Sequence, residues 1–146
     1  MKKTLLLIFA ITLYGCSSNE DSNLQNENFI NPPSWIQGTW VDEKDNTTSN
    51  TSSKRGFIFM KDDWCIALFS KINEINGQKN CQEEKLILAN INNIKAYTTE
   101  EITNEKYFIE IVLPDEIYFF EFSKISSNEI SIKSSYANEG VYTKVF

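Results

Sequence analysis

Few side chains in this sequence are of the types that usually carry out chemistry. The chain of 146 residues contains no histidine, so the commonest general base of enzymes is missing. Acidic residues outnumber lysine and arginine by 20 to 14, and the formal net charge of −6 argues against a broad basic surface for nucleic acid. No spacing typical of a metal site or a phosphate-binding loop occurs. These features predict no catalytic site, no cofactor, no metal and no nucleic-acid partner.

Carboxylates are the remaining candidates for acid–base chemistry. Asp62 and Asp63 are adjacent, and neighbouring side chains in a turn or strand diverge, so we interpret them as turn residues. Glu110 and Glu121 fall on one face of two predicted strands, and a retaining glycosidase would need two carboxyl groups about 5 Å apart. Because that face is expected to be the outer one, the sequence does not predict an enzyme.

The N-terminus has the features of a secretory signal. Lys2 and Lys3 form a short basic region, and Thr4–Leu13 is an apolar run interrupted only by threonines. As a helix this run would be only about 16 Å long, against about 30 Å for the hydrocarbon core of a bilayer. We therefore expect residues 1–15 to be a cleaved signal peptide rather than a retained membrane span.

The residues Leu13-Tyr14-Gly15-Cys16 resemble the lipobox of bacterial lipoproteins. The resemblance implies cleavage before Cys16 and acylation of this residue, so that diacylglycerol and palmitate-type chains would anchor the protein in the bilayer. Ser17 follows in place of Asp, which by similarity to known sorting rules favours the outer membrane, on its periplasmic or its cell-surface face. Glu20-Asp21 resembles the surface-export signal of Bacteroidota-type lipoproteins.

A polar tether is expected to follow the acylated cysteine. Residues 17–31 are rich in Asn, Ser, Glu and Asp, so their burial could not offset the entropy lost on ordering. Pro32-Pro33 then stiffens the chain. We therefore expect the lipidated cysteine and a flexible tether over residues 16–33, and one folded domain over residues 34–146. Loss of Lys2 and Lys3 with the signal would change the formal net charge from −6 to −8.

Cys65 and Cys81 are the two other cysteines. In an oxidising compartment they form the one internal pair available, closing a loop of about 15 residues that is worth about 3 kcal/mol in the chain-entropy model. A reactive thiol would need a neighbour that lowers its pKa, and no histidine is present to do so. The sequence therefore predicts a disulfide between them.

Alternation of apolar and polar residues predicts a hairpin near the end of the chain. Tyr107–Leu113 and Glu116–Lys124 are both strand-like runs, separated by Pro114-Asp115. A two-residue turn would pair Leu113 with Glu116 and carry this register along both strands. One face of the hairpin would then be wholly apolar and aromatic. Its members are Tyr107, Ile109, Ile111, Tyr118, Phe120 and Phe122.

A second hairpin is predicted from Gly56–Met60 and Trp64–Phe69. Residues 72–84 are expected to form a short helix or a long loop. Further strands are expected at Gly38–Asp42, Leu86–Asn90, Ile94–Thr99, Glu129–Lys133 and Val141–Val145. Many short strands without a convincing long helix predict an all-β fold: an antiparallel up-and-down barrel of about eight strands, with a β-sandwich as the alternative.

Gly38 and Trp40, at the start of the domain, resemble the Gly-x-Trp opening of lipocalins and related calycin barrels. With the proline-rich boundary and the alternating strands, the chain looks like the lipocalin-like domains of small Bacteroidota lipoproteins. The resemblance implies that Trp40 closes one end of a barrel and that Gly38 permits a tight turn into the first strand. Lipocalins usually carry a late arginine over this tryptophan, and here the last strand offers Lys144.

Two functions are consistent with these features. The first is an outer-membrane lipoprotein whose barrel interior binds a small apolar or amphipathic ligand, lined by the six hairpin residues given above. The second is an envelope-tethered protein-interaction, inhibitor or immunity module with a filled barrel, whose acidic surface attracts a basic envelope protein. An open or a filled interior distinguishes the two.

Overall fold

The structure is a computed structural model that describes residues 29–42, 54–71, 74–75, 79–137 and 139–145. The predicted signal peptide, Cys16 and most of the predicted tether lie outside these residues. None of the helices in the described part of the chain is long and apolar enough to cross a membrane.

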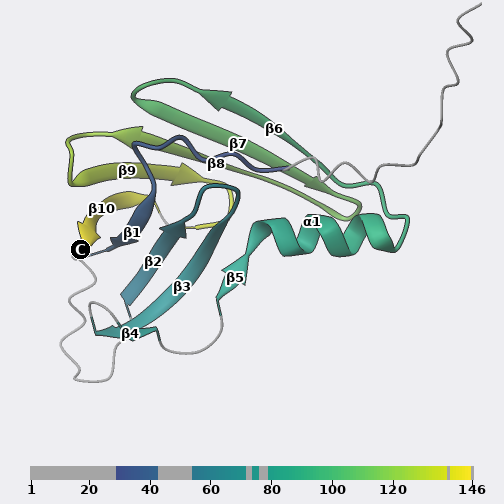
Figure 1. Cartoon of the computed structure of the whole chain (residues 1–146), viewed down its shortest axis with the longest axis horizontal. Helices are drawn as coiled ribbons and strands as arrows, with labels where there is room; N and C mark the ends of the chain where they lie inside the picture. The colour runs from purple at the N-terminus through teal and green to yellow at the C-terminus, as the bar shows by residue number, and fades with distance from the viewer. Residues whose placement is uncertain (1–28, 43–53, 72–73, 76–78, 138, 146) are drawn as a thin grey trace, which may run out of the picture.

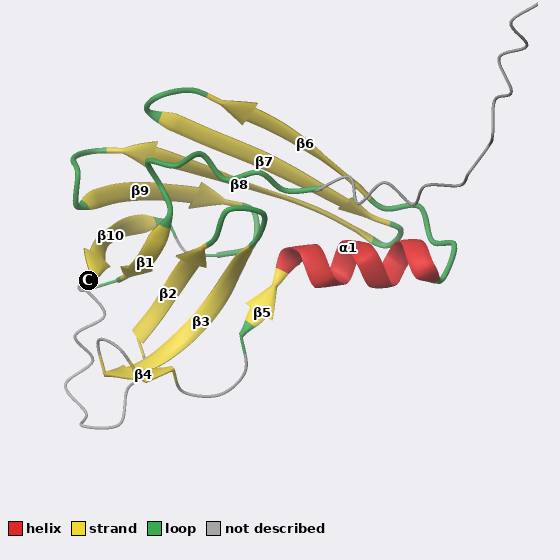
Figure 2. Cartoon of the chain, viewed as in Figure 1, coloured by secondary structure: helices red, strands yellow, loops and turns green. Residues whose placement is uncertain are grey.

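The described chain forms one antiparallel sheet and one helix (Figures 1 and 2). Neighbouring strands follow the order β4-β3-β2-β1-β10-β9-β8-β7-β6, and β5 pairs with β3. The prediction of an all-β, antiparallel, barrel-like fold is therefore confirmed. The elements are β1 (Gly38–Val41), β2 (Lys54–Phe59), β3 (Trp64–Lys71), β4 (Glu74–Ile75), β5 (Asn80–Cys81), α1 (Gln82–Ile91), β6 (Tyr97–Ile102), β7 (Lys106–Leu113), β8 (Glu116–Lys124), β9 (Glu129–Ser134) and β10 (Gly140–Val145).

The sheet curls into a half-barrel. The first and last strands pair with each other, as in an up-and-down barrel, because β1 lies between β2 and β10. The two ends of the sheet, β4 and β6, instead fall in the middle of the chain, on either side of α1 in sequence. In Figure 1 the helix runs beside the end of the β7–β8 hairpin, on the side where the curl is open. The β-sandwich alternative does not occur among the described strands, which belong to a single sheet.

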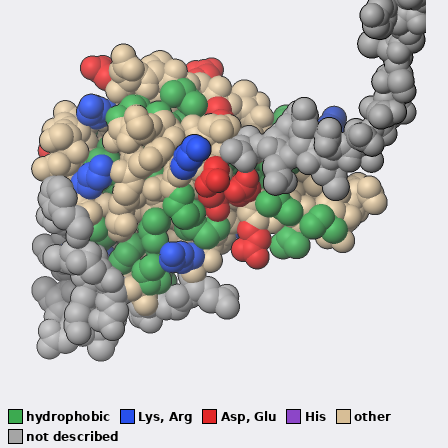
Figure 3. Space-filling model, in the orientation of Figure 1, with side chains coloured by type: hydrophobic (Ala, Val, Ile, Leu, Met, Phe, Trp, Pro, Cys, Tyr) green, Lys and Arg blue, Asp and Glu red, His purple; other side chains and the backbone are tan. Residues whose placement is uncertain are grey.

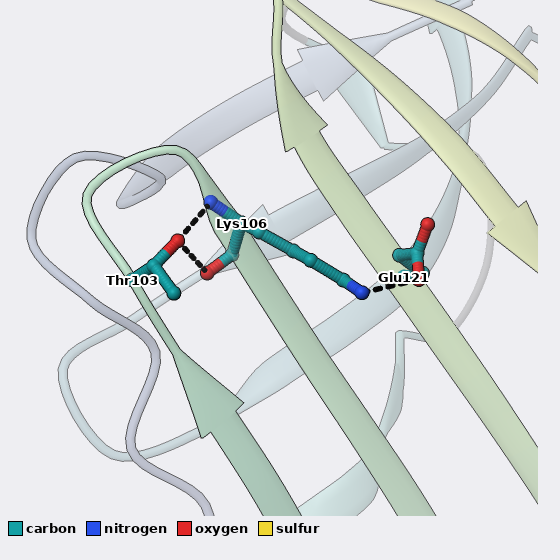
Figure 4. Close-up of polar contacts among 3 residues, drawn as sticks. All are labelled: Thr103, Lys106 and Glu121. Carbon is teal, nitrogen blue, oxygen red and sulfur yellow. Dashed lines mark hydrogen bonds and ion pairs between the residues drawn. The ribbon is translucent and has the colours of Figure 1, made fainter.

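The β7–β8 hairpin has the predicted register. Leu113 pairs with Glu116 across the two-residue turn, and the pairing continues without a shift to Lys106 and its partner in β8. On the outer face, Nζ of Lys106 lies 2.7 Å from a carboxylate oxygen of Glu121 (Figure 4). The hydroxyl of Thr103 accepts a hydrogen bond from the backbone N–H of Lys106 at 2.8 Å and closes the β6–β7 turn. Apolar alternation and a short turn therefore suffice to set this register.

The strand predicted at Leu86–Asn90 is wrong, because these residues lie in α1. The helix buries Gln82, Leu86 and Ala89, whose spacing of four and three residues is that of one helical face. Acidic residues occupy its first turn, where they interact favourably with the helix dipole. After the helix, Asn93 has a positive φ of 56°, a conformation that Asn tolerates well and that ends helices. The following strand therefore starts at Tyr97, later than predicted.

The folded domain begins earlier than residue 34. Ile30 and Ile36 are completely buried, and Ile30 belongs to the main core. The Thr98 hydroxyl donates to the carbonyl of Phe29, and the backbone N–H of Asn31 donates to the Glu100 carboxylate at 2.9 Å. Residues 29–36 therefore lie over the core-facing side of β6. Apolar side chains at Phe29 and Ile30, set within a polar stretch, are what makes this end of the predicted tether part of the domain.

Gly56 in β2 provides a test of how closely this strand packs against β1 and the ring of Phe69. A Cβ there would lie 2.5 Å from the carbonyl oxygen of Trp40 and 2.6 Å from the ring of Phe69, so the backbone would have to shift. We expect Gly56→Ala to lower the free energy of unfolding by about 2–3 kcal/mol, measured by urea denaturation. Gly140→Ala is the matched control, since its nearest contact would be at 3.5 Å. Equal stabilities of the two variants would contradict this prediction.

Candidate functional site

The interior of the half-barrel is filled by the side chains predicted to face it. The six hairpin residues proposed as ligand-lining have relative exposures of 5% or less. The rings of Phe120 and Phe122 stack at 5.9 Å, and Trp64 stands edge-on to Phe120 at 4.6 Å. Phe57 of β2 approaches the same two phenylalanines at 6.2 and 5.6 Å. The six residues therefore form a largely aromatic core with the opposite wall, and none of them lines the three best-formed hollows on the described surface.

Two tyrosine hydroxyls in this core have hydrogen-bond partners. The Tyr107 hydroxyl donates to the Glu100 carboxylate at 2.5 Å, and the Tyr118 hydroxyl bonds the amide oxygen of Gln82 at 3.0 Å. Burial and the neighbouring Glu100 raise the pKa of Tyr107, and burial raises the pKa of Tyr118 to about 12. Both hydroxyls therefore stay protonated at neutral pH and link β7 to β6 and β8 to α1.

Trp40, singled out with Gly38 from the sequence, lies buried at the start of the sheet. Its indole N–H donates to the carbonyl of Ile36 at 2.6 Å. Lys144 is its cross-strand partner in β10, and the lysine Nζ lies 5.2 Å from the centre of the indole. Gly38 has a φ of 124°, which other residues rarely adopt. A lysine cation therefore covers this tryptophan, at the place where the resemblance to lipocalins suggests an arginine.

Cys65 and Cys81 form the disulfide expected from the sequence. They are directly opposed residues of β3 and β5, with Cα atoms 3.9 Å apart. Asp63 lies close to both sulfur atoms, within 4.8 Å. Because the two sulfurs are bonded to each other, neither is a thiolate that could bind a metal. The bond instead attaches the residue immediately before α1 to the strand β3.

Asp63 caps α1 from a distant part of the sequence. Cys81, the N-cap residue, makes no side-chain hydrogen bond to the helix. One carboxylate oxygen of Asp63 accepts the backbone N–H of Gln82 at 3.2 Å and of Glu83 at 2.9 Å, and also that of Trp64 at 2.7 Å. The helix therefore obtains from the β2–β3 turn the acceptor that a local N-cap side chain would normally provide.

Three carboxylates gather where this turn meets the helix. Burial raises the pKa of Asp63, and its backbone hydrogen bonds offset part of the rise. Burial and the charges of Asp63 and Asp62 also raise the pKa of Glu83. We call Asp62, Asp63 and Glu83 the acidic end of α1. Figure 3 shows acidic side chains gathered in this part of the molecule, with hydrophobic side chains further along α1.

The largest hollow described lies outside the core, between α1 and the β7–β8 turn. Its volume is about 1090 Å³. Most of its lining residues are apolar, and two lysines and two carboxylates are also among them. The lining residues are Lys85, Ala89, Ile94, Lys95, Tyr97, Val112, Leu113, Pro114, Asp115, Glu116 and Ile117.

Three residues that line this groove, Ile94, Tyr97 and Ile117, are exposed, and Leu88 and Ile91 are exposed elsewhere on α1. Ile117 is 66% exposed and Ile91 70%, high values for side chains of this kind. We call the exposed residues Leu88, Ile91, Ile94, Tyr97 and Ile117 the apolar face. The strand predicted at Leu86–Asn90 gave the exposed side chains of α1 a place in the sheet, so the sequence did not predict this face. A helical reading of Gln82–Ile91 would have left Ile87, Leu88 and Ile91 without a place in the core.

Comparison of the chain with protein-family models, curated proteins and solved structures finds no match.

The cap of α1 by Asp63 leads to a pH-dependent prediction. Asp63→Ala removes the acceptor and should cost about 1–2 kcal/mol of the free energy of unfolding, whereas Asp63→Asn keeps an oxygen and should cost less. Because the pKa of Asp63 is higher in the folded chain than its ordinary value of 3.8, the folded state retains a proton that the unfolded state has lost. The free energy of unfolding of the wild type should therefore fall, relative to Asp63→Asn, as the pH rises from about 3.8 through the raised pKa that Asp63 has in the folded chain.

Urea titrations of both proteins at several pH values measure this difference. Glu83 contributes to this difference with the same sign. The charge of Asp63 helps to raise the pKa of Glu83, and Asp63→Asn removes that charge. A stability difference between the wild type and Asp63→Asn that does not change between pH 4 and pH 7 would overturn this account of the helix cap.

Proposed function

We propose that this chain is an outer-membrane lipoprotein that acts as an envelope-tethered protein-interaction module. The observation that favours this function over carriage of a small ligand is the filled interior. Phe120 and Phe122 are completely buried against Phe57 of the opposite wall, and the buried Tyr107 stacks on Phe122, so the half-barrel serves as a scaffold. Recognition then takes place on the outer surface.

The acidic end of α1 is the surface that we assign to the partner. Asp62 is exposed, and Asp63 and Glu83 are close enough to it for their charges to repel. The disulfide and the cap hold these groups in a fixed arrangement, so part of the entropy cost of binding is met by the fold. A concentrated negative charge on a chain whose net charge is already negative attracts a basic protein and accelerates its association.

Neutralising this surface tests the proposal. The variant Asp62→Asn/Glu83→Gln should associate with its envelope partner about 2- to 10-fold more slowly, with a weaker dependence on salt. The matched control is Glu105→Gln/Glu129→Gln, which changes the charge equally at the other end of β7 and β8. Pull-downs from envelope extract followed by association kinetics with the recovered protein give the comparison. Equal loss in both double variants, or a small apolar molecule bound to the wild type in native mass spectrometry, would contradict the proposal.

The lipid anchor is tested separately at Cys16. In the wild type we expect metabolic labelling with palmitate and recovery in the membrane fraction, because several acyl chains, at about 0.8 kcal/mol per buried methylene, hold a protein stably. Cys16→Ser should lose the label, whereas Cys65→Ser/Cys81→Ser should retain it. Equal labelling of Cys16→Ser and wild type would show that the anchor is elsewhere.

A further inference from the structure

We propose that the apolar face rests on the surface of the lipid bilayer, so that the domain is held against the membrane in one orientation. This inference depends on the proposed acylation of Cys16. It concerns the other end of α1 from the surface assigned to the protein partner. The occupant is the interfacial layer of a membrane composed mainly of zwitterionic lipid.

The position at which the described chain starts supports this assignment. The carbonyl of Phe29 accepts the hydroxyl of Thr98, so the described chain starts beside the beginning of β6, on the opposite side of that strand from Tyr97 of the apolar face. Thirteen peptide steps separate Phe29 from Cys16, and even fully extended they span no more than about 45 Å. An anchored protein therefore keeps this end of the domain close to the bilayer, at a high effective concentration.

The chemistry of the apolar face matches a membrane interface. Isoleucine and leucine supply apolar area, and Tyr97 is a type of residue enriched at the level of the lipid headgroups. Nζ of Lys95 lies 5.7 Å from the centre of the Tyr97 ring, which places an ammonium group beside an aromatic ring. Lysines that lie along apolar surface with the charge directed to water are common at such interfaces.

The charges around the groove are of both signs. Lys85 and Lys95 stand with Asp115 and Glu116 around the apolar lining. A zwitterionic headgroup offers a phosphate to the lysines and an ammonium group to the carboxylates, so neither pair has to be left without a partner. A basic protein would find no net attraction here, in contrast to the acidic end of α1. The contact should therefore be driven by apolar area and be largely insensitive to salt.

Environment-sensitive labels on two exposed isoleucines test the proposal. Full-length protein carrying Ile117→Cys or Ile125→Cys is labelled with a nitrobenzoxadiazole dye and reconstituted in vesicles of phosphatidylethanolamine and phosphatidylcholine. Ile117 lies in the apolar face, whereas Ile125 is 53% exposed just beyond the other end of β8, about 25 Å away at the rise of a strand. Lipids that carry a nitroxide spin label should quench the dye at position 117 at least 3-fold more than the dye at position 125, at low salt and at about 0.5 M salt.

The variant Ile94→Ser/Tyr97→Ser, made with the label at position 117, should reduce this quenching to the level at position 125, since it removes two exposed side chains that line the groove. Equal quenching at the two positions overturns the proposal. So does crosslinking of two Ile117→Cys chains to each other in detergent, because the face would then join two copies.

Phase separation in detergent reports on acylation independently. Recovery in the aqueous phase shows that the anchor has failed, whereas recovery in the detergent phase with equal quenching shows that only the orientation is wrong.

Discussion

The fold depends on burying one apolar, largely aromatic face of a long antiparallel sheet. A sheet of this kind cannot remain flat, because rings such as Phe57, Phe120 and Tyr142 need neighbours on every side. Curling brings β2 opposite β8, so that Phe57 meets Phe120, Phe122 and Tyr142 within 5.2–6.2 Å. Edge-to-face contacts between aromatic rings contribute beyond the area that they bury. The half-barrel is therefore the shape that lets both walls share one aromatic core.

A half-barrel leaves an opening, and two segments outside the main strands cover it. Residues 29–36 bring Ile30 and Ile36 over the core side of β6, and α1 contributes Leu86. The helix is held in place by the disulfide to β3, the cap from Asp63 and the hydrogen bond between Gln82 and Tyr118. Each of these contacts joins residues far apart in the chain. The position of α1 therefore depends on the sheet being formed.

This arrangement fills the interior, and the function that we propose therefore uses the outer surface. The tyrosine hydroxyls that would have given polarity to a ligand cavity are instead bonded to Glu100 and Gln82. The outer surface of α1 differs along its length, with carboxylates at its first turn and exposed isoleucine and leucine toward its last. A helix with these two ends suits a domain that meets a charged partner on one side and an apolar layer on the other.

The residue pattern alone determined much of the fold. Strict alternation over Tyr107–Leu113 and Glu116–Lys124 predicted the buried face, the turn and the register, since a slip of one residue would turn every ring toward solvent. Two lone cysteines predicted the disulfide, and Gly38 and Trp40 marked the first strand.

The apolar face, the cap of α1 and the state of the interior were decided by the tertiary structure. In Leu86–Asn90 the short apolar run fits a strand as well as a helix, and the choice depends on Asp63, which lies about 20 residues away in the sequence. Ile30 looked like part of a polar tether because its partners come from β6 and the core, beyond the reach of any local pattern. Alternation says which side chains face inward, but whether they meet or leave a cavity depends on how strongly the sheet curls, and that is a property of all the strands together.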